Sequence, residues 1–270
     1  MALESKILTR LEPTLELDEL RFKSYGEQAG DNPGNSNTSR ELGVEFPLII
    51  INGYRFNQED ISNFEISLDG IVPTISLTII DNQSYFTADS FPRDGDVINV
   101  RIASKAKNDY KDIRIDFDID DVDSPPRSNF AKGSGRGKYS FTGRMKIPGL
   151  YSEDCKEYGL GTSVEHLETM VTDLKIGLAS NIDTSDDAMK VMTSFEPMLD
   201  TITDLVSHSY VNEDSFQTFS IDPWYYLNFV DMNLLLNAEE SFEDALASMD
   251  TDFNDILGPG ATEATNEQET

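Results

Sequence analysis

Four aspartates with alternating spacing are the residues whose pattern most directly suggests chemistry. They are Asp112, Asp116, Asp118 and Asp120. Alternating aspartates open the loop of an EF-hand calcium site, but a loop beginning at Asp116 would need glycine at position 121 and glutamate at position 127. The chain has Asp121 and Arg127 at those positions. We therefore predict no metal site, and we interpret the four aspartates as an acidic strand face that lines a lumen or meets a partner.

The histidines and the cysteine lack the sequence neighbours that nucleophilic or metal chemistry requires. The chain has one cysteine, Cys155, and two histidines, His166 and His208. They form no paired-histidine metal motif, and the chain has no Gly-x-Ser-x-Gly elbow. The glycines of segment 133–138 also miss the phosphate-loop pattern, because Tyr139 stands where serine or threonine is required. We predict no catalytic residue and no cofactor; a Cys155–histidine pair or a two-carboxylate hydrolase are the enzymatic alternatives.

A run of aromatic residues near the C-terminal end has two interpretations. Trp224, Tyr225 and Tyr226 are consecutive, and three aromatic faces could stack on a sugar ring, as in a carbohydrate-binding module. The same residues belong to two β-rich runs that resemble a strand hairpin. We prefer this second interpretation, a hairpin in the core or at a subunit contact. Its candidate residues are Phe216, Phe219, Ile221, Trp224, Tyr225, Tyr226 and Phe229.

The acidic strand belongs to a longer series of predicted strands. Apolar and polar residues alternate in 64–68 and in 75–79, as they do in strands with one buried face. In 112–120 the large apolar side chains fall on one face and the aspartates on the other. Asn52-Gly53 predicts a two-residue hairpin turn, because both residues tolerate a positive φ. These patterns predict an antiparallel sheet or small barrel that begins in residues 44–103.

The pattern changes to a helical period after the strand-rich region. Thr162, with Glu165 three residues later, forms a capping box, and apolar residues then recur at helical spacing. A second short helix is expected from Thr184, and residues 7–11 also suggest a short helix. The predicted fold class is therefore α+β, with an antiparallel β-barrel or sheet domain followed by a small α+β domain.

The chain divides into four predicted segments. Residues 1–43 form an N-terminal arm or linker, which is either disordered or docks on a neighbouring subunit. Residues 44–149 form the β domain, with a loop insertion at about 104–138. Residues 150–237 form the α+β domain. Residues 238–270 form a C-terminal helix and a disordered, acidic tail, so that both termini are expected to be flexible.

Charge and composition exclude several classes of function. The chain of 270 residues has a formal net charge of −29, which repels DNA, RNA and anionic membranes. Such a chain can still lie beside DNA that passes without binding. One cysteine forbids an internal disulfide. No apolar run is long enough to span a bilayer, and the N-terminus lacks a secretory pattern. We expect folding in a cytoplasm and no membrane insertion by this chain.

The order of the segments resembles a known family of virion proteins. Five stretches of the sequence carry the resemblance: Phe46-Pro-Leu-Ile-Ile-Ile-Asn-Gly53 with Val72-Pro-Thr-Ile-Ser-Leu-Thr-Ile-Ile-Asp81, Pro92-Arg-Asp-Gly-Asp-Val-Ile-Asn-Val100, Phe141-Thr-Gly-Arg-Met-Lys-Ile-Pro-Gly-Leu150, Gly161-Thr-Ser-Val-Glu-His-Leu167, and Ser207-His-Ser-Tyr210 with the aromatic run 215–231. Together they resemble the tail-hub proteins of contractile-tailed bacteriophages, including the T-even-type baseplate hub and the base of type VI secretion spikes. The resemblance covers roughly residues 45–236.

The resemblance implies a structural role without enzymatic activity. Hub proteins form a ring, continue the tail tube above and carry the central spike below, so the expected partners are further copies of this chain, the tail tube protein, the spike and other baseplate proteins. The first domain would then be a tube-type barrel, and the chain would belong to the virion baseplate after assembly in the host cytoplasm. Family members have two similar barrels, whereas no second barrel follows Asn237 here. A ring of three and a ring of six therefore both stay open.

Overall fold

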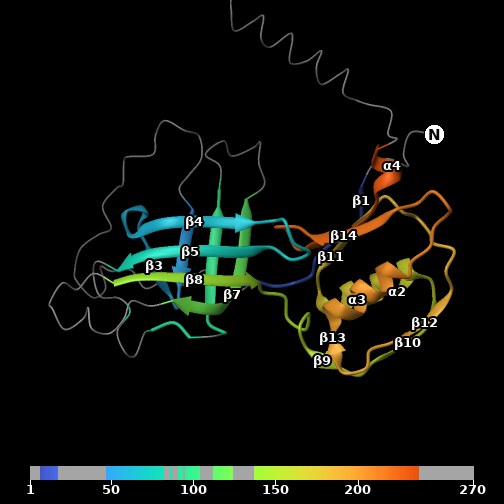
Figure 1. The fold of residues 1–270 in the computed structure, drawn as a ribbon, viewed down its shortest axis with the longest axis horizontal. Coiled ribbons are helices and arrows are strands. Elements are labelled where there is room, and N and C mark those ends of the chain that lie inside the picture. The colour runs from blue at the N-terminus through green and yellow to red at the C-terminus, as the bar shows by residue number, and fades with distance from the viewer. Residues whose placement is uncertain are drawn as a thin grey trace, which may run out of the picture.

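The structure is a computed structural model, and it describes residues 7–17, 47–81, 86, 91–93, 95–103, 112–123 and 137–236. The predicted C-terminal helix and tail over 238–270, most of the arm 1–43 and much of the insertion 104–138 lie outside these residues. Figure 1 shows two lobes side by side, a β lobe and an α+β lobe. The predicted α+β fold class is therefore confirmed.

The β lobe is one antiparallel sheet of seven strands in the order β3-β2-β6-β7-β8-β5-β4. The strands are β2 (Leu48–Ile51), β3 (Tyr54–Phe56), β4 (Ile61–Ser67), β5 (Thr74–Asp81), β6 (Val97–Ile102), β7 (Ile113–Asp123) and β8 (Gly137–Met145). A 3-10 turn, η1 (Gln58–Asp60), precedes β4. In Figure 1 the strands β4, β5 and β8 run across the direction of β7, so the sheet curls.

The predicted hairpin turn and the predicted buried face of β7 are confirmed, whereas Leu68, predicted to be on a buried face, lies after β4 and is exposed. Asn52 and Gly53 both have positive φ, 49° and 80°, and they join β2 to β3. In β7 the residues Ile115, Phe117 and Ile119 are buried on one face. They contribute to a core that also contains a cluster of rings, in which Phe86 lies 5.0 Å from Tyr139 and 5.6 Å from Phe141 between centroids. Burial of these apolar surfaces is the main term that holds the curled sheet together.

The α+β lobe is built on a four-stranded sheet in the order β1-β11-β15-β14. These strands are β1 (Leu8–Leu11), β11 (Gly177–Ser180), β14 (Gln217–Ile221) and β15 (Tyr226–Asp231). The helices α2 (Ser163–Leu174) and α3 (Met198–Ser207) pack with this sheet, and a short helix α4 (Met232–Leu236) follows it. Two strand pairs complete the lobe: β9 (Glu153–Asp154) with β13 (Glu196–Pro197), and β10 (Glu157–Gly161) with β12 (Met189–Met192).

One of the helices predicted for this lobe forms with its expected cap, and another does not form. The capping box of α2 is confirmed, because the Thr162 side chain accepts a hydrogen bond from the Glu165 N–H and the Glu165 side chain accepts one from the Thr162 N–H. The short helix expected from Thr184 is wrong. That segment is irregular and leads into β12, which pairs with β10. None of the helices in the described ranges is long and apolar enough to cross a membrane.

The helix suggested for residues 7–11 is also wrong, since Leu8–Leu11 forms the edge strand β1. Pro13 disfavours helical backbone at the residue before it and cannot donate a helical hydrogen bond itself. The strand instead gains backbone partners from β11, with Leu8 opposite Ser180 and Thr9 opposite Ala179. The apolar residues of this segment therefore mark a contact with a distant sheet.

At the bulge where β7 meets β8, the two strands come so close that Gly143 has no room for a side chain. A Cβ added at Gly143 would lie 2.5 Å from the Asp118 carbonyl oxygen, whereas one added at Gly159 would meet nothing within 4 Å. We expect Gly143→Ala to lower the free energy of unfolding by about 1–3 kcal/mol, because backbone must shift. Urea denaturation measures this, with Gly159→Ala as the control at under about 0.5 kcal/mol. Equal effects of the two substitutions would contradict the close approach at the bulge.

Candidate functional site

The two lobes meet at Tyr225, which joins two of the residue sets predicted from the sequence. The Tyr225 hydroxyl accepts a hydrogen bond of 3.0 Å from the backbone N–H of Asp116 in β7. The Tyr225 side chain is buried, with 4% of its surface exposed. The acidic strand and the aromatic hairpin, which are about 100 residues apart in the sequence, therefore share one contact.

The turn between β14 and β15 aims the Tyr225 ring at β7. The Asp222 carboxylate accepts hydrogen bonds from the N–H groups of Trp224 at 2.9 Å and Tyr226 at 3.0 Å. Tyr225 itself adopts a φ of 64°, which is uncommon for a bulky residue. The side-chain bonds of Asp222 hold this turn, since an aspartate at a turn binds backbone N–H groups close after it in the sequence.

The backbone N–H of Asp116 can reach Tyr225 because the neighbouring strand β8 has ended at this point. Residues of β8 pair with β7 from Phe117 onward, and the next residue after β8, Lys146, donates its N–H to the Asp116 carbonyl at 2.7 Å. A buried N–H without an acceptor would be costly. Burial raises the pKa of Tyr225 above its ordinary value, so the hydroxyl stays neutral and keeps its hydrogen at neutral pH.

The side chain of Asp116 does not belong to an exposed acidic face. It is buried, with 6% of its surface exposed, and it accepts a hydrogen bond of 2.8 Å from the Asn99 amide. The sequence pattern predicts the outer face for Asp116 because this residue alternates with buried isoleucines. That alternation is correct, but the second lobe covers the outer face here. For Asp116, the interpretation as a residue facing a lumen or partner is therefore wrong.

The other three aspartates of the strand pair with basic side chains of the same sheet and its continuation. Asp112 binds Arg101 at 2.5 Å, Asp118 lies 3.4 Å from Lys146, and Asp120 lies 3.2 Å from Arg144. Each pair is partly exposed and contributes little to stability. The face carries alternating charges, so its field is weaker than four aspartates alone would produce. That it lines a lumen or meets a partner stays a prediction.

The aromatic hairpin is partly core and partly surface. Ile221 and Phe229 are buried, Phe219 is half-buried, and Phe216 is 64% exposed. The sugar-platform alternative finds no support, because the three rings of Trp224–Tyr226 do not form one open face. Tyr225 is buried, and the Tyr226 ring covers Gly177, where an added Cβ would lie 2.5 Å from the ring.

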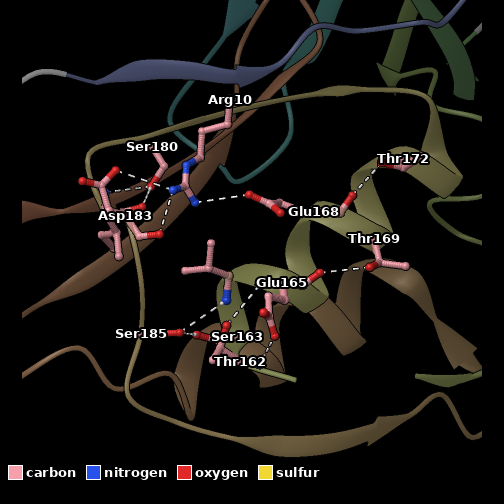
Figure 2. Close-up of polar contacts among 12 residues, drawn as sticks. Arg10, Thr162, Ser163, Glu165, Glu168, Thr169, Thr172, Ser180, Asp183 and Ser185 are labelled. Carbon is pink, nitrogen blue, oxygen red and sulfur yellow. Dashed lines mark hydrogen bonds and ion pairs between the residues drawn. The ribbon is translucent and has the colours of Figure 1, made fainter. Parts of the chain in front are cut away.

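A docking site for the N-terminal segment lies on the α+β lobe, and its details are not evident from the sequence. Of the predicted arm 1–43, the structure describes residues 7–17, and from here on the arm means these residues alone. Its strand β1 pairs with β11, and the Thr14 N–H donates to the Lys175 carbonyl at 2.9 Å. Figure 2 shows the Arg10 side chain between two acidic residues. Its Nη1 atom lies 3.3 Å from Oε1 of Glu168 in α2, and its Nη2 donates a hydrogen bond of 2.7 Å to the backbone carbonyl of Asp183.

Tyr226 in β15 also contacts the arm. Its hydroxyl donates a hydrogen bond to the Glu12 carboxylate, and this bond raises the pKa of Tyr226 to about 12. Because the folded pKa lies above the unfolded one, the contribution of this bond is complete below pH 10 and disappears as the pH rises toward 12. The sequence signal for the site is the leucine spacing of the arm, which by itself suggests a helix.

The two histidines have structural hydrogen-bond partners. His166 shares a hydrogen bond of 3.0 Å with the Met189 carbonyl, and His208 one of 2.7 Å with the Asp204 carbonyl. Cys155 is exposed. Two hollows of about 220 and 290 Å³ flank the β10–β12 pair, and both are smaller than a typical ligand pocket. Within the described ranges, no three acidic, histidine or cysteine side chains are grouped as a metal site.

Comparison with known proteins finds solved structures that are similar at low sequence identity. No protein-family model and no curated protein matches the chain. One similar solved structure is the 43 kDa tail protein of prophage MuSo2 from Shewanella oneidensis, with a TM-score of 0.47 and 15% identity over 68% of this chain and 54% of that one. Another is a tail protein from Neisseria meningitidis MC58, with a TM-score of 0.42 and 11% identity over 70% and 50%. This chain spans about half the length of each.

Removal of the Tyr225 hydroxyl tests the junction. We expect Tyr225→Phe to lower the free energy of unfolding by about 1–3 kcal/mol, because the Asp116 N–H would be left buried without its acceptor. Chemical denaturation measures the change. Tyr210→Phe, at a residue that is 44% exposed, is the matched control and should change stability by less than about 0.5 kcal/mol. A neutral Tyr225→Phe would show that the bond contributes nothing.

Gly177 tests the arm site. A Cβ at Gly177 would lie 2.5 Å from the Tyr226 ring and 2.8 Å from the Leu11 carbonyl oxygen. We expect Gly177→Ala to displace the arm, so that the backbone amides of β1 exchange with solvent much faster than in the parent. Hydrogen-exchange mass spectrometry of peptides that cover β1 and β7 measures this. Unchanged exchange in β1 would contradict the close contact, and the β7 peptide serves as the internal control.

Proposed function

We propose that this chain is a structural protein of a contractile bacteriophage tail. It acts there as a baseplate hub that joins the tail tube to the central spike and surrounds the DNA channel. The observation that carries the proposal is a curled antiparallel sheet with an open edge at β4. Among the described residues, β4 pairs only with β5.

Open edges suit a protein that functions in a ring. An edge strand presents unpaired N–H and C=O groups and is a template for pairing with another chain. Copies arranged around an axis repeat the same contact, and the ring closes when the rotation between copies completes a circle. In a hub, the β4 edge of each curled sheet would face a neighbouring copy, and the sheets of all copies would together surround the channel.

The segments that carry the family resemblance support the proposal, because they form regular elements of both lobes. Phe46–Gly53 contains β2 and Val72–Asp81 contains β5, while Pro92–Val100 and Phe141–Leu150 contain parts of β6 and β8. The Gly161–Leu167 stretch contains the capped start of α2, and the aromatic run contains β14 and β15. The resemblance therefore rests on residues that build the fold.

The net negative charge of the chain supports a role beside DNA that the chain does not bind. A formal charge of −29 repels phosphate groups, so DNA would pass without specific binding. Asp112, Asp118 and Asp120 do not account for this field, because each is paired with a base. Assignment to the virion baseplate, and contact with tube, spike and other baseplate proteins, follow from the proposed hub role.

Light scattering of the purified chain tests the proposal. We expect a mass of three or six times the 30.2 kDa of one chain. The ring should become more populated as salt rises from about 10 mM to 300 mM, because the Debye length falls from about 30 Å to 6 Å and like-charged copies repel less. Glycerol of equal osmolality is the control and should not promote assembly. A 30.2 kDa monomer at every salt and protein concentration would contradict the hub role for the isolated chain.

A further inference from the structure

The arm site on the α+β lobe offers a second contact between copies. We propose that, in the ring, the arm of each chain docks on the β11 edge of a neighbouring copy, so that β1 is exchanged between subunits. This proposal rests on the ring put forward above. In such a ring, the arm would link one subunit to the next, and the β11 edge would be the surface that binds it.

The arm is attached to its docking site by sequence-specific contacts. Strand pairing sets the register, with Leu8 opposite Ser180 and Thr9 opposite Ala179. Arg10 then places a positive charge between two acids, 3.3 Å from Glu168 and 3.6 Å from Asp183. The arm therefore binds specifically to the β11 edge of the four-stranded sheet. Every copy of the chain presents this same edge.

The docking edge needs a strand from some copy of the chain. All four residues of β11, Gly177 to Ser180, are buried, and on its other side β11 pairs in parallel with β15. Without β1, the outer backbone groups of β11 would lose their partners, and the edge would be exposed to unselective pairing. The arm is thus a required part of the lobe, whichever copy supplies it.

The arm makes no polar contact that binds it to its own β lobe. Its hydrogen bonds and ion pairs involve Glu168, Lys175, Asp183, Tyr226 and β11, which all belong to the α+β lobe. Within the described part of the chain, none of these polar contacts reaches the seven-stranded sheet. The polar contacts of the arm therefore lie entirely on the α+β lobe, and these contacts are the same for an arm from the same chain or from a neighbour.

The length of the intervening chain permits exchange. Residues 18–46 separate the arm from the first strand of the β lobe, which is 29 residues of sequence. A chain of this length reaches at most roughly 100 Å, whereas a compact protein of this size has a radius of gyration of about 18 Å. The tether can therefore reach an adjacent subunit.

Exchange of the arm would also offset the electrostatic repulsion between copies in the ring. Copies that each carry a formal charge of −29 repel one another. An exchanged arm keeps all of its contacts and adds a covalent tether across each subunit boundary, so it opposes the repulsion at no loss of pairing. Arg10 contributes directly, because it brings a positive charge from one copy to Glu168 and Asp183 of the next.

Engineered disulfides distinguish the two sources of the arm. The parent is the full chain with Cys155→Ser, which removes the only cysteine. Thr9→Cys with Ala179→Cys places two thiols at directly opposed positions of β1 and β11, within the usual Cα separation for a disulfide. Leu8→Cys with Ser180→Cys repeats the test at the adjacent pair. Thr9→Cys with Gly159→Cys, which are not paired, is the control.

Exchange predicts a covalent ladder on non-reducing gels that ends at the ring number found by light scattering. A second sample mixes chains that carry Thr9→Cys alone with chains that carry Ala179→Cys alone, and exchange predicts a covalent dimer there. An internally bridged single chain, in a sample that light scattering shows to be a ring, overturns exchange and leaves the hub function standing. A monomer at every salt concentration overturns both. A ring without any disulfide at either pair, with melting temperatures equal to the parent, also overturns the exchange.

Discussion

Backbone hydrogen-bonding groups at the ends and edges of strands are the constraint on which this structure depends. Each strand that ends or lies at an edge leaves N–H and C=O groups that need partners, and buried groups of this kind are costly to leave unpaired. At Asp116 the partner is a tyrosine hydroxyl from the other lobe. At β11 it is the arm. At β4, the described residues supply a partner strand on one side only.

This constraint explains why the two lobes have a defined arrangement. The β lobe and the α+β lobe contribute to one continuous apolar core cluster, which supplies most of the favourable free energy but little directional preference. Direction comes from polar contacts such as Tyr225 with Asp116, and from the Ile221 N–H that donates to the Ile71 carbonyl at 2.7 Å. The hairpin that looked like a sugar platform is thus the part that orients one lobe on the other.

The same contacts change how the charge of the protein is understood. An alternating run of aspartates suggests a strongly negative surface, but three of them lie beside arginine or lysine and one is buried. The members of these pairs, such as Asp120 and Arg144, lie apart in the sequence. A local sequence pattern therefore does not show that they are paired. The net charge of −29 is a property of the whole chain, and no single strand face can be identified with it.

The sequence by itself determined the elements whose signals are local. Asn52-Gly53 specified a turn because both residues accept a positive φ, Thr162 and Glu165 specified the start of a helix through their own side chains, and alternation placed Phe117 in the core. Only the tertiary structure decided the state of Leu8–Leu11, the burial of Asp116 and the separate roles of Tyr225 and Tyr226. Each of these depends on a partner more than 100 residues away, and a free energy that comes from such a partner leaves no pattern in the residues around the position itself.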